Sequence, residues 1–199
     1  MGEHLRERLI SSATVFSGRL ICVRVDEVEL ADGGRATREV VVHPGAVAIV
    51  PLLPGQKVVM IRQYRHPAGK VLYELPAGTL RPGESPEACA RRELVEEVGY
   101  QAGDLTHLFS MYLSPGYCSE RIHLYLATGL VPATGTEACG ARPDEDERVE
   151  PLVVALGEAA AMIARGEVEN AAAVAGLLAV TAGLPRVGQA GAGHPMEKE

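Results

Sequence analysis

Three glutamates in the middle of the chain have the types and spacing to bind a metal ion: Glu93, Glu96 and Glu97. In a helix, which turns by about 100° per residue, these side chains lie within a wedge of about 100° on one face. Like charges at these spacings repel one another. A divalent cation would relieve the repulsion, since Mg²⁺ and Mn²⁺ prefer hard oxygen ligands. The cluster therefore predicts metal-assisted chemistry, with a solvated acidic helix face as the alternative.

The segment that contains these glutamates has strong signals for a helix over residues 85–99. Ser85 is a favourable N-cap, Pro86 suits the first helical position, and Glu87 favours the positive end of the helix dipole. Gly99 suits the left-handed residue that follows the last turn. The helix is expected to pack against a core through an apolar stripe beside the glutamates, formed by Ala90, Leu94 and Val98.

Alternating and β-branched apolar segments predict a strand-rich core around this helix. A turn at residues 31–34 divides residues 15–42 into antiparallel strands, which predicts a small N-terminal sheet. Further strands are expected at 46–53, 57–63, 72–75, 105–112, 122–127 and 149–154, and helices at 156–165 and 170–181. The predicted class is α+β, with an N-terminal sheet region at 1–43, a main domain at 44–183 and a disordered tail at 184–199.

Composition argues against several classes of protein. The chain has 47% hydrophobic and 23% charged residues, a formal net charge of −7 and no long basic run, so we expect no nucleic-acid partner. No apolar run approaches the length of a membrane span, and the amino terminus lacks an apolar signal region. We therefore expect a cytoplasmic protein without a membrane partner. The four cysteines form no CxxC pair, and neither a zinc cluster nor a disulfide framework is indicated.

Residues 78–100 read Gly-x5-Glu-x7-Arg-Glu-Leu-x-Glu-Glu-x-Gly-Tyr, which resembles the Nudix box over its whole length. Every charged and glycine position matches, and the last position departs because Tyr100 stands where an aliphatic residue is usual. The preceding Leu-Pro-Ala-Gly at 75–78 and Pro115, sixteen positions beyond Gly99, resemble the ADP-ribose pyrophosphatase branch. The resemblance covers most of residues 15–182. It implies an α/β/α sandwich with a mixed sheet, and an N-terminal sheet exchanged across a homodimer.

The resemblance also implies a ligand set for the metal ion. Glu93, Glu97 and the carbonyl of Ala77 would hold Mg²⁺, with Mn²⁺ or another divalent cation as alternatives. Glu96 would be a further ligand or would support one. Arg92 and Glu84 would tie the loop that precedes the helix to the helix itself.

A loop glutamate would complete the catalytic site when substrate binds. The resemblance implies that it comes from the acidic segment 144–147, with Glu145 as the base that accepts a proton from water and Glu147 as a metal contact. The choice between the two stays open, and an acidic surface turn is the alternative for the whole segment. The catalytic set implied by the resemblance is Glu93, Glu97 and Glu145.

Four charged residues outside the motif are candidates for binding the substrate. Arg65 suits a diphosphate, since a guanidinium presents forked donors to phosphate oxygens. Arg38 and Glu39, on the N-terminal sheet, are candidates for the adenosine end, and Glu120 is a candidate for the terminal ribose. Each is also compatible with an ordinary surface charge.

The activity that the resemblance implies is Mg²⁺-dependent hydrolysis of ADP-ribose to AMP and ribose 5-phosphate. The box residues handle the diphosphate, so they do not distinguish this substrate from GDP-mannose or ADP-glucose. Another nucleotide-sugar pyrophosphatase is therefore the first alternative. The second is a sensor that binds ADP-ribose without cutting it, although such proteins typically lack box carboxylates that are all present in this chain.

Overall fold

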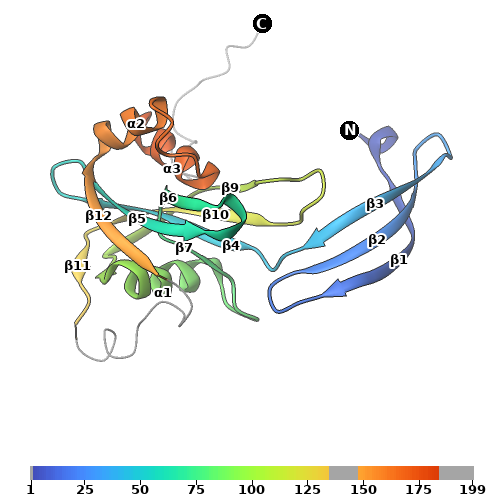
Figure 1. Ribbon diagram of the computed structural model, residues 1–199, viewed down its shortest axis with the longest axis horizontal. Coiled ribbons are helices and arrows are strands. Elements are labelled where there is room, and N and C mark those ends of the chain that lie inside the picture. Colours follow the sequence, from blue (N-terminus) through green and yellow to red (C-terminus); the bar gives the residue numbers. More distant parts are fainter. Residues whose placement is uncertain (1, 135–147, 184–199) are drawn as a thin grey trace, which may run out of the picture. The chain divides into compact units, whose positions relative to one another are not determined.

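The structure is a computed structural model that describes residues 2–134 and 148–183 of the 199-residue chain. Contacts divide the chain into two compact units, which are residues 1–45 with 112–121, and residues 46–111 with 122–199. The expected tail at 184–199 lies outside the described residues, and so do Glu145 and Glu147. The helices and strands of both units are labelled in Figure 1.

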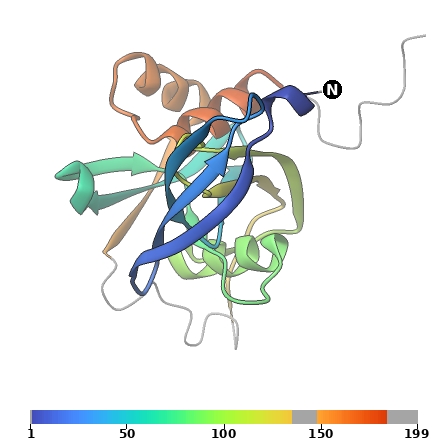
Figure 2. The same ribbon diagram turned by 90° about the vertical axis from the view of Figure 1, so that its right-hand side faces the viewer.

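A three-stranded antiparallel sheet makes up most of the first unit, and its strands lie side by side in blue in Figure 2. A short helix, η1 (Glu3–Leu5), precedes β1 (Arg8–Ser17), β2 (Cys22–Glu29) and β3 (Arg35–Val42), which pair in that order. In the turn between β2 and β3, Asp32 Oδ1 accepts a hydrogen bond from the Gly34 amide at 2.9 Å. Gly33 in this turn has a φ of 84°, which glycine adopts without strain. The expected small N-terminal sheet is confirmed.

Strand β1 was not among the strands expected from the sequence. All ten of its residues are exposed, so its sequence carries no alternation between a buried and an exposed face. Its place is set by pairing with β2, where the Arg8 guanidinium and the Glu29 carboxylate are 2.6 Å apart. Such a contact joins positions 21 residues apart, and local periodicity does not reveal it.

A seven-stranded mixed sheet forms the centre of the second unit. Its main path is β12-β5-β4-β10-β9, with β6 paired to β5 and β7 paired to β4. Strands β4 and β10 are parallel, while β5 is antiparallel to β4, β6 and β12. The strands are β4 (Ala46–Leu53), β5 (Lys57–Arg65), β6 (Lys70–Glu74), β7 (Ala77–Thr79), β9 (Asp104–Tyr112), β10 (Arg121–Thr128) and β12 (Val149–Ala155). Helix η2 (His66–Ala68) follows β5, and β8 (Tyr100–Gln101) pairs separately with β11 (Val131–Pro132).

Helices cover both faces of this sheet, as Figure 1 shows. Helix α1 (Pro86–Val98) packs on one face, where its Leu94 belongs to a buried cluster with Val47 and Ile49 of β4. Helices α2 (Leu156–Ala164) and α3 (Ala171–Thr181) cover the other face, where α3 lies against Val50. Strand β4 is therefore buried on both sides, which explains its continuous apolar sequence. Among the described residues, no helix has the length and apolar character needed to cross a membrane.

Strand β5 presents alternate side chains to these two faces. Leu52 of β4 shares the face of Val50, toward α3, and its partner on β5 is Val58. Side chains alternate along a strand, so Gln63 and Arg65 point to the opposite face, which α1 covers. The predicted α+β class with a mixed sheet is confirmed. The side chains at the end of β5, those of Gln63 and Arg65, point to the face of the sheet that is covered by α1 and its glutamates.

The packing of α3 against the sheet can be tested with a glycine-to-alanine change. A Cβ atom at Gly176 would lie 2.7 Å from Leu75 Cδ1 and 3.0 Å from Val50 Cγ2. Gly176→Ala is therefore expected to lower the free energy of unfolding by about 1–2 kcal/mol, measured by urea denaturation. The matched control is Gly157→Ala in α2, where a Cβ would have no neighbour within 4 Å. The control should be neutral or stabilising by up to about 1 kcal/mol, and equal stabilities of the two variants would contradict the described packing.

Candidate active site

Helix α1 begins and ends where the sequence predicts. Ser85 Oγ accepts a hydrogen bond from the Ala88 amide at 3.2 Å, and Pro86 is the first helical residue. Gly99 has a left-handed φ of 71°, and its amide donates to carbonyls of the last turn. These ends fix which side chains face the sheet, and the buried ones are Cys89, Ala90, Glu93, Leu94 and Glu97.

Two of the predicted metal ligands, Glu93 and Glu97, are buried one helical turn apart. Their exposed fractions are 8% and 7%, and ionised carboxylates are costly to bury unless they are paired. Glu97 Oε2 accepts a hydrogen bond from the Ala77 amide at 2.8 Å, which joins α1 to the start of β7. The structure thus places these three residues together, while their roles as metal ligands stay predictions.

Gly78 leaves the space in which the Glu93 carboxylate lies. A Cβ atom at this position would be 1.8 Å from Glu93 Oε1 and 2.0 Å from its carboxyl carbon. No real Cβ contact is that short, so any other residue at position 78 would displace the carboxylate. Gly99 is favoured by its left-handed backbone conformation. The φ of Gly78 is not in that region, so glycine is required there by the close approach of the Glu93 carboxylate.

Arg92 holds together the carboxylates of the loop and the helix. Its guanidinium donates to Glu84 at 2.9 Å and 3.0 Å, to Glu93 Oε1 at 2.5 Å and to Glu96 Oε2 at 2.8 Å. The hydrogen bonds from Arg92 lower the pKa of Glu84 to about 2, while the same contacts raise the pKa of Arg92. Glu96 also lies 3.7 Å from the Arg81 guanidinium. Loop and helix are therefore tied by the pair that the sequence resemblance implied, Arg92 and Glu84.

Cys89 lies beneath the same loop but is not a nucleophile in this arrangement. It is fully buried, and its thiol donates toward the Gly78 and Thr79 carbonyls at 3.8 Å and 3.6 Å. Burial raises the pKa of this thiol to about 12, so it stays protonated at neutral pH. All three described cysteines have free thiols.

The donor groups where the buried face of α1 meets β7 fit a hard divalent cation. The groups there are carboxylate and carbonyl oxygens, and two of the carboxylates, those of Glu93 and Glu97, are buried with like charge. Within residues 2–134 and 148–183, no three His, Cys, Asp or Glu side chains are arranged as a preformed metal site. The carboxylates of Glu93 and Glu96 accept hydrogen bonds from Arg92, and that of Glu97 accepts one from the Ala77 amide.

Arg65 lies at the end of β5, where a buried carboxylate fixes its guanidinium. Arg65 Nε donates to Glu74 Oε1 at 3.0 Å, and Nη2 donates to Oε2 at 2.7 Å. Glu74 is only 2% exposed, and it lies on the α1 face because it pairs with Ile61. Sequence analysis did not single out Glu74. The signal that could have found it is a lone carboxylate within the apolar stretch before Leu75-Pro76.

The other candidates for substrate binding belong to the first unit. Arg38 Nε donates to Glu7 Oε2 at 3.0 Å, and this contact raises the pKa of Arg38. Glu39 is exposed on β3, opposite Val25 of β2. Glu120 is partly buried, with Oε1 3.9 Å from His43 Nδ1. No described contact joins any two of these three candidates, Arg38, Glu39 and Glu120.

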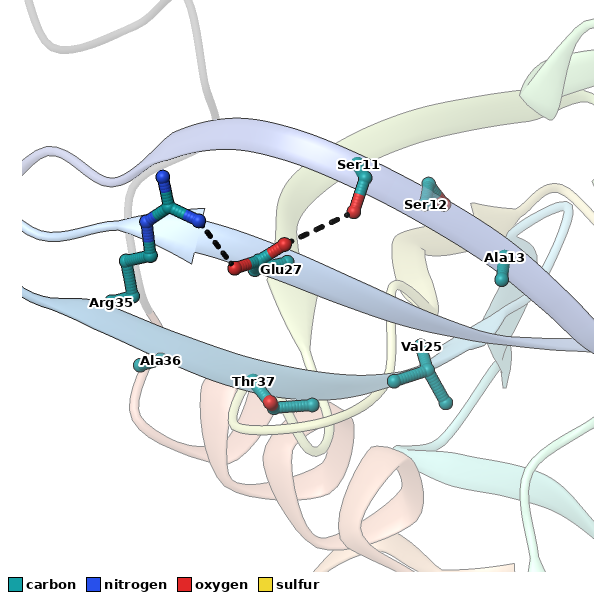
Figure 3. A pocket seen from close by; sticks show the side chains of 8 residues that line it. All are labelled: Ser11, Ser12, Ala13, Val25, Glu27, Arg35, Ala36 and Thr37. Carbon is teal, nitrogen blue, oxygen red and sulfur yellow. Dashed lines mark hydrogen bonds and ion pairs between the residues drawn. The ribbon is translucent and has the colours of Figure 1, made fainter.

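A cavity of about 480 Å³ lies on the sheet of the first unit. Figure 3 shows its lining, in which Glu27 accepts hydrogen bonds from Ser11 Oγ at 3.5 Å and from Arg35 Nη1 at 3.1 Å. The lining does not include Arg38, Glu39 or Glu120. All of its lining residues belong to the first unit, whereas Glu93 and Glu97 belong to the second.

Two family models match successive parts of the chain. The model for the NUDIX domain matches residues 42–175, and the model for the nucleoside diphosphate sugar hydrolase N-terminal domain matches residues 7–41. The first match contains α1 with all of its glutamates, and the second contains β1, β2 and most of β3.

Relatives of known function cover most of the chain. An ADP-ribose pyrophosphatase of Mycobacterium tuberculosis is 44% identical over 183 residues, which is 92% of this chain and 86% of the relative. A methanol dehydrogenase activator of Bacillus methanolicus is 44% identical over 159 residues, or 80% of this chain and 84% of the relative. A crystal structure of an ADP compounds hydrolase aligns with a TM-score of 0.77 and 28% identity, over 90% of this chain and 95% of that chain.

The hydrogen bonds between Glu84 and Arg92 predict a pH-dependent contribution to stability. The pKa of Glu84 is lowered from 4.5 to about 2 in the folded protein, so its contribution is complete above pH 4.5 and is lost as the pH falls through about 2. Glu84→Gln is expected to lower the free energy of unfolding by about 1–2 kcal/mol at pH 7. Urea denaturation at several pH values should show the difference from wild type shrinking below pH 4.5.

The control for this measurement is Glu87→Gln on the exposed side of the same helix. Glu87 pairs with Arg91 at 2.9 Å in a surface contact, and such pairs contribute at most about 0.5 kcal/mol. A Glu84→Gln deficit that stayed constant from pH 7 to pH 3 would contradict the described interaction.

Proposed function

The chain belongs to the NUDIX domain family, and we propose that this pyrophosphohydrolase cleaves ADP-ribose to AMP and ribose 5-phosphate in a metal-dependent reaction. The observation that carries the proposal is the burial of Glu93 and Glu97 beside Ala77 and Gly78, within a complete motif. The choice of ADP-ribose is supported by the relative of that activity, which aligns with 92% of this chain.

Hydrolysis of a pyrophosphate requires water to reach a phosphorus atom that negative oxygens surround. Members of the family generally use divalent metal ions, and in this chain Glu93, Glu97 and the Ala77 carbonyl would hold one, with Glu96 in support. When bound, the ion would supply charge neutralisation and Lewis acidity at the pyrophosphate. We favour Mg²⁺, with Mn²⁺ or another divalent cation as alternatives.

The residues of the chain have distinct tasks in this proposal. Arg92 holds Glu93 and Glu96 in place through hydrogen bonds of 2.5 Å and 2.8 Å. Arg65, oriented by Glu74, presents a guanidinium to the diphosphate on the α1 face of the sheet. A glutamate outside the described residues accepts the proton of the attacking water. We assign that step to Glu145, and Glu147 to a metal contact.

The N-terminal sheet is proposed to bind the nucleoside and sugar ends of the substrate. Arg38 and Glu39 would contact adenosine and Glu120 the terminal ribose, in a cytoplasmic homodimer whose N-terminal sheets are exchanged. The match of residues 7–41 to a nucleoside diphosphate sugar hydrolase N-terminal domain supports a role for this region in substrate binding. A ligand at Arg38 would compete with the ion pair between Arg38 and Glu7.

The direct test is a panel of substrates: ADP-ribose, GDP-mannose and ADP-glucose, each with Mg²⁺ and with a chelator. The proposal requires that ADP-ribose gives the highest kcat/KM and that AMP and ribose 5-phosphate are the products. A preference for GDP-mannose or ADP-glucose would select another nucleotide-sugar pyrophosphatase. Binding of ADP-ribose without cleavage would select the sensor, and full activity in chelator would contradict the role of a metal ion.

The role of Glu97 is tested by Glu97→Gln. The amide keeps an oxygen that can accept from the Ala77 amide, so the fold should be retained while the charge is lost. We expect kcat to fall by roughly two to four orders of magnitude with an unchanged melting temperature. Glu87→Gln, on the exposed side of the helix, serves as the control and should keep wild-type turnover. Wild-type turnover of Glu97→Gln would remove this residue from the mechanism.

A further inference from the structure

Gln63 on β5 has a buried acceptor that the protein itself does not satisfy. The residue is only 7% exposed, and Oε1 has no hydrogen-bond partner among the described residues. A buried polar atom without a partner destabilises a protein by about 1–3 kcal/mol. The four preceding buried positions on this strand, residues 58–61, are all apolar, and an apolar residue at 63 would avoid that cost. Packing alone therefore does not explain why position 63 carries an amide side chain.

The position of Gln63 places it between the two charges of the Arg65–Glu74 ion pair. Gln63 and Arg65 share the α1 face of β5, with Cα atoms about 7 Å apart. On the adjacent strand β6, Gln63 pairs with Leu72, and the neighbouring partners are Lys70 for Arg65 and Glu74 for Ile61. The side chain of Arg65 reaches back along the strands to Glu74, so it passes the row that contains Gln63.

The unsatisfied atom defines the chemistry of the group that would bind it. Oε1 of an amide accepts hydrogen bonds, and diphosphate oxygens are acceptors as well, so a diphosphate alone leaves Gln63 unsatisfied. A sugar esterified to the diphosphate carries hydroxyl groups, which can donate a hydrogen bond to such an acceptor. The site thus offers a cation for the phosphate and an acceptor for a nearby hydroxyl.

We propose that Gln63 Oε1 accepts a hydrogen bond from a sugar hydroxyl of the substrate while Arg65 binds the diphosphate. This inference rests on the proposed function and adds a residue that determines specificity. A site that hydrogen-bonds a substrate hydroxyl discriminates strongly against ligands that lack it, because its buried polar atom is then left unpaired. Gln63 therefore favours ligands that present a sugar hydroxyl beside the diphosphate over ligands that lack that hydroxyl.

The test uses Gln63→Leu, which removes the acceptor and keeps most of the side-chain volume. We expect kcat/KM for ADP-ribose to fall at least about 10-fold, with a melting temperature equal to or above that of wild type. Stability should not fall, because the variant removes an unsatisfied buried atom. The matched control is Gln101→Leu on β8, a partly buried glutamine on another strand, which should keep wild-type kinetics.

Inhibition by ADP identifies which sugar supplies the hydroxyl, since ADP has the adenosine ribose and the diphosphate but lacks the terminal sugar. If Gln63→Leu lowers the turnover of ADP-ribose but leaves inhibition by ADP unchanged, the hydroxyl that Gln63 binds belongs to the terminal sugar. If the variant weakens both the turnover and the inhibition, the hydroxyl belongs to the adenosine ribose. If Gln63→Leu leaves both unchanged, or only lowers the melting temperature, Gln63 has a structural role and the inference is overturned.

Wild-type turnover is measured in the same series, so that the two proposals fail in different ways. A wild-type protein that does not cleave ADP-ribose would contradict the proposed function. Cleavage by the wild type that Gln63→Leu and Gln63→Met both retain in full would contradict only the role of Gln63. The second variant guards against a folding defect that is specific to leucine.

Discussion

The candidate active site depends on the burial of two like charges, Glu93 and Glu97, at the inner edge of helix α1. Charged carboxylates are destabilising in a protein interior unless other groups compensate them. Here Arg92 donates to Glu93, the Ala77 amide donates to Glu97, and Gly78 leaves the space that the Glu93 carboxylate fills. The sheet of the second unit supports this arrangement, because β7, which carries Ala77 and Gly78, is held beside the helix by its pairing with β4.

Much of the site could be predicted because its determinants are local in sequence. The N-cap at Ser85 and the left-handed Gly99 fix the bounds of α1, and the spacing of the glutamates then fixes their common face. Tyr100, the one departure from the usual motif, packs at the edge of the apolar cluster behind the helix.

Other features could not be predicted, because long-range pairing decides them. Strand β1 lacks a buried face, so periodicity did not distinguish it from a loop. The partnership of Arg65 with Glu74 and the position of Gln63 depend on the register between β5 and β6. That register follows from the packing of the whole sheet and not from any local motif. Sequence analysis therefore found Arg65 but neither the carboxylate that orients it nor the amide beside it.

The most direct test of this account is the turnover of Gly78→Ala beside that of Gly157→Ala. A methyl group at position 78 would overlap the Glu93 carboxylate, which lies at the end of a flexible side chain, so the fold should survive while the carboxylate moves. A displacement of about 1 Å can cost roughly 100-fold in rate, so we predict at least that loss of kcat for Gly78→Ala and none for Gly157→Ala. Wild-type turnover by a folded Gly78→Ala protein would contradict the claim that the position of Glu93 governs the chemistry.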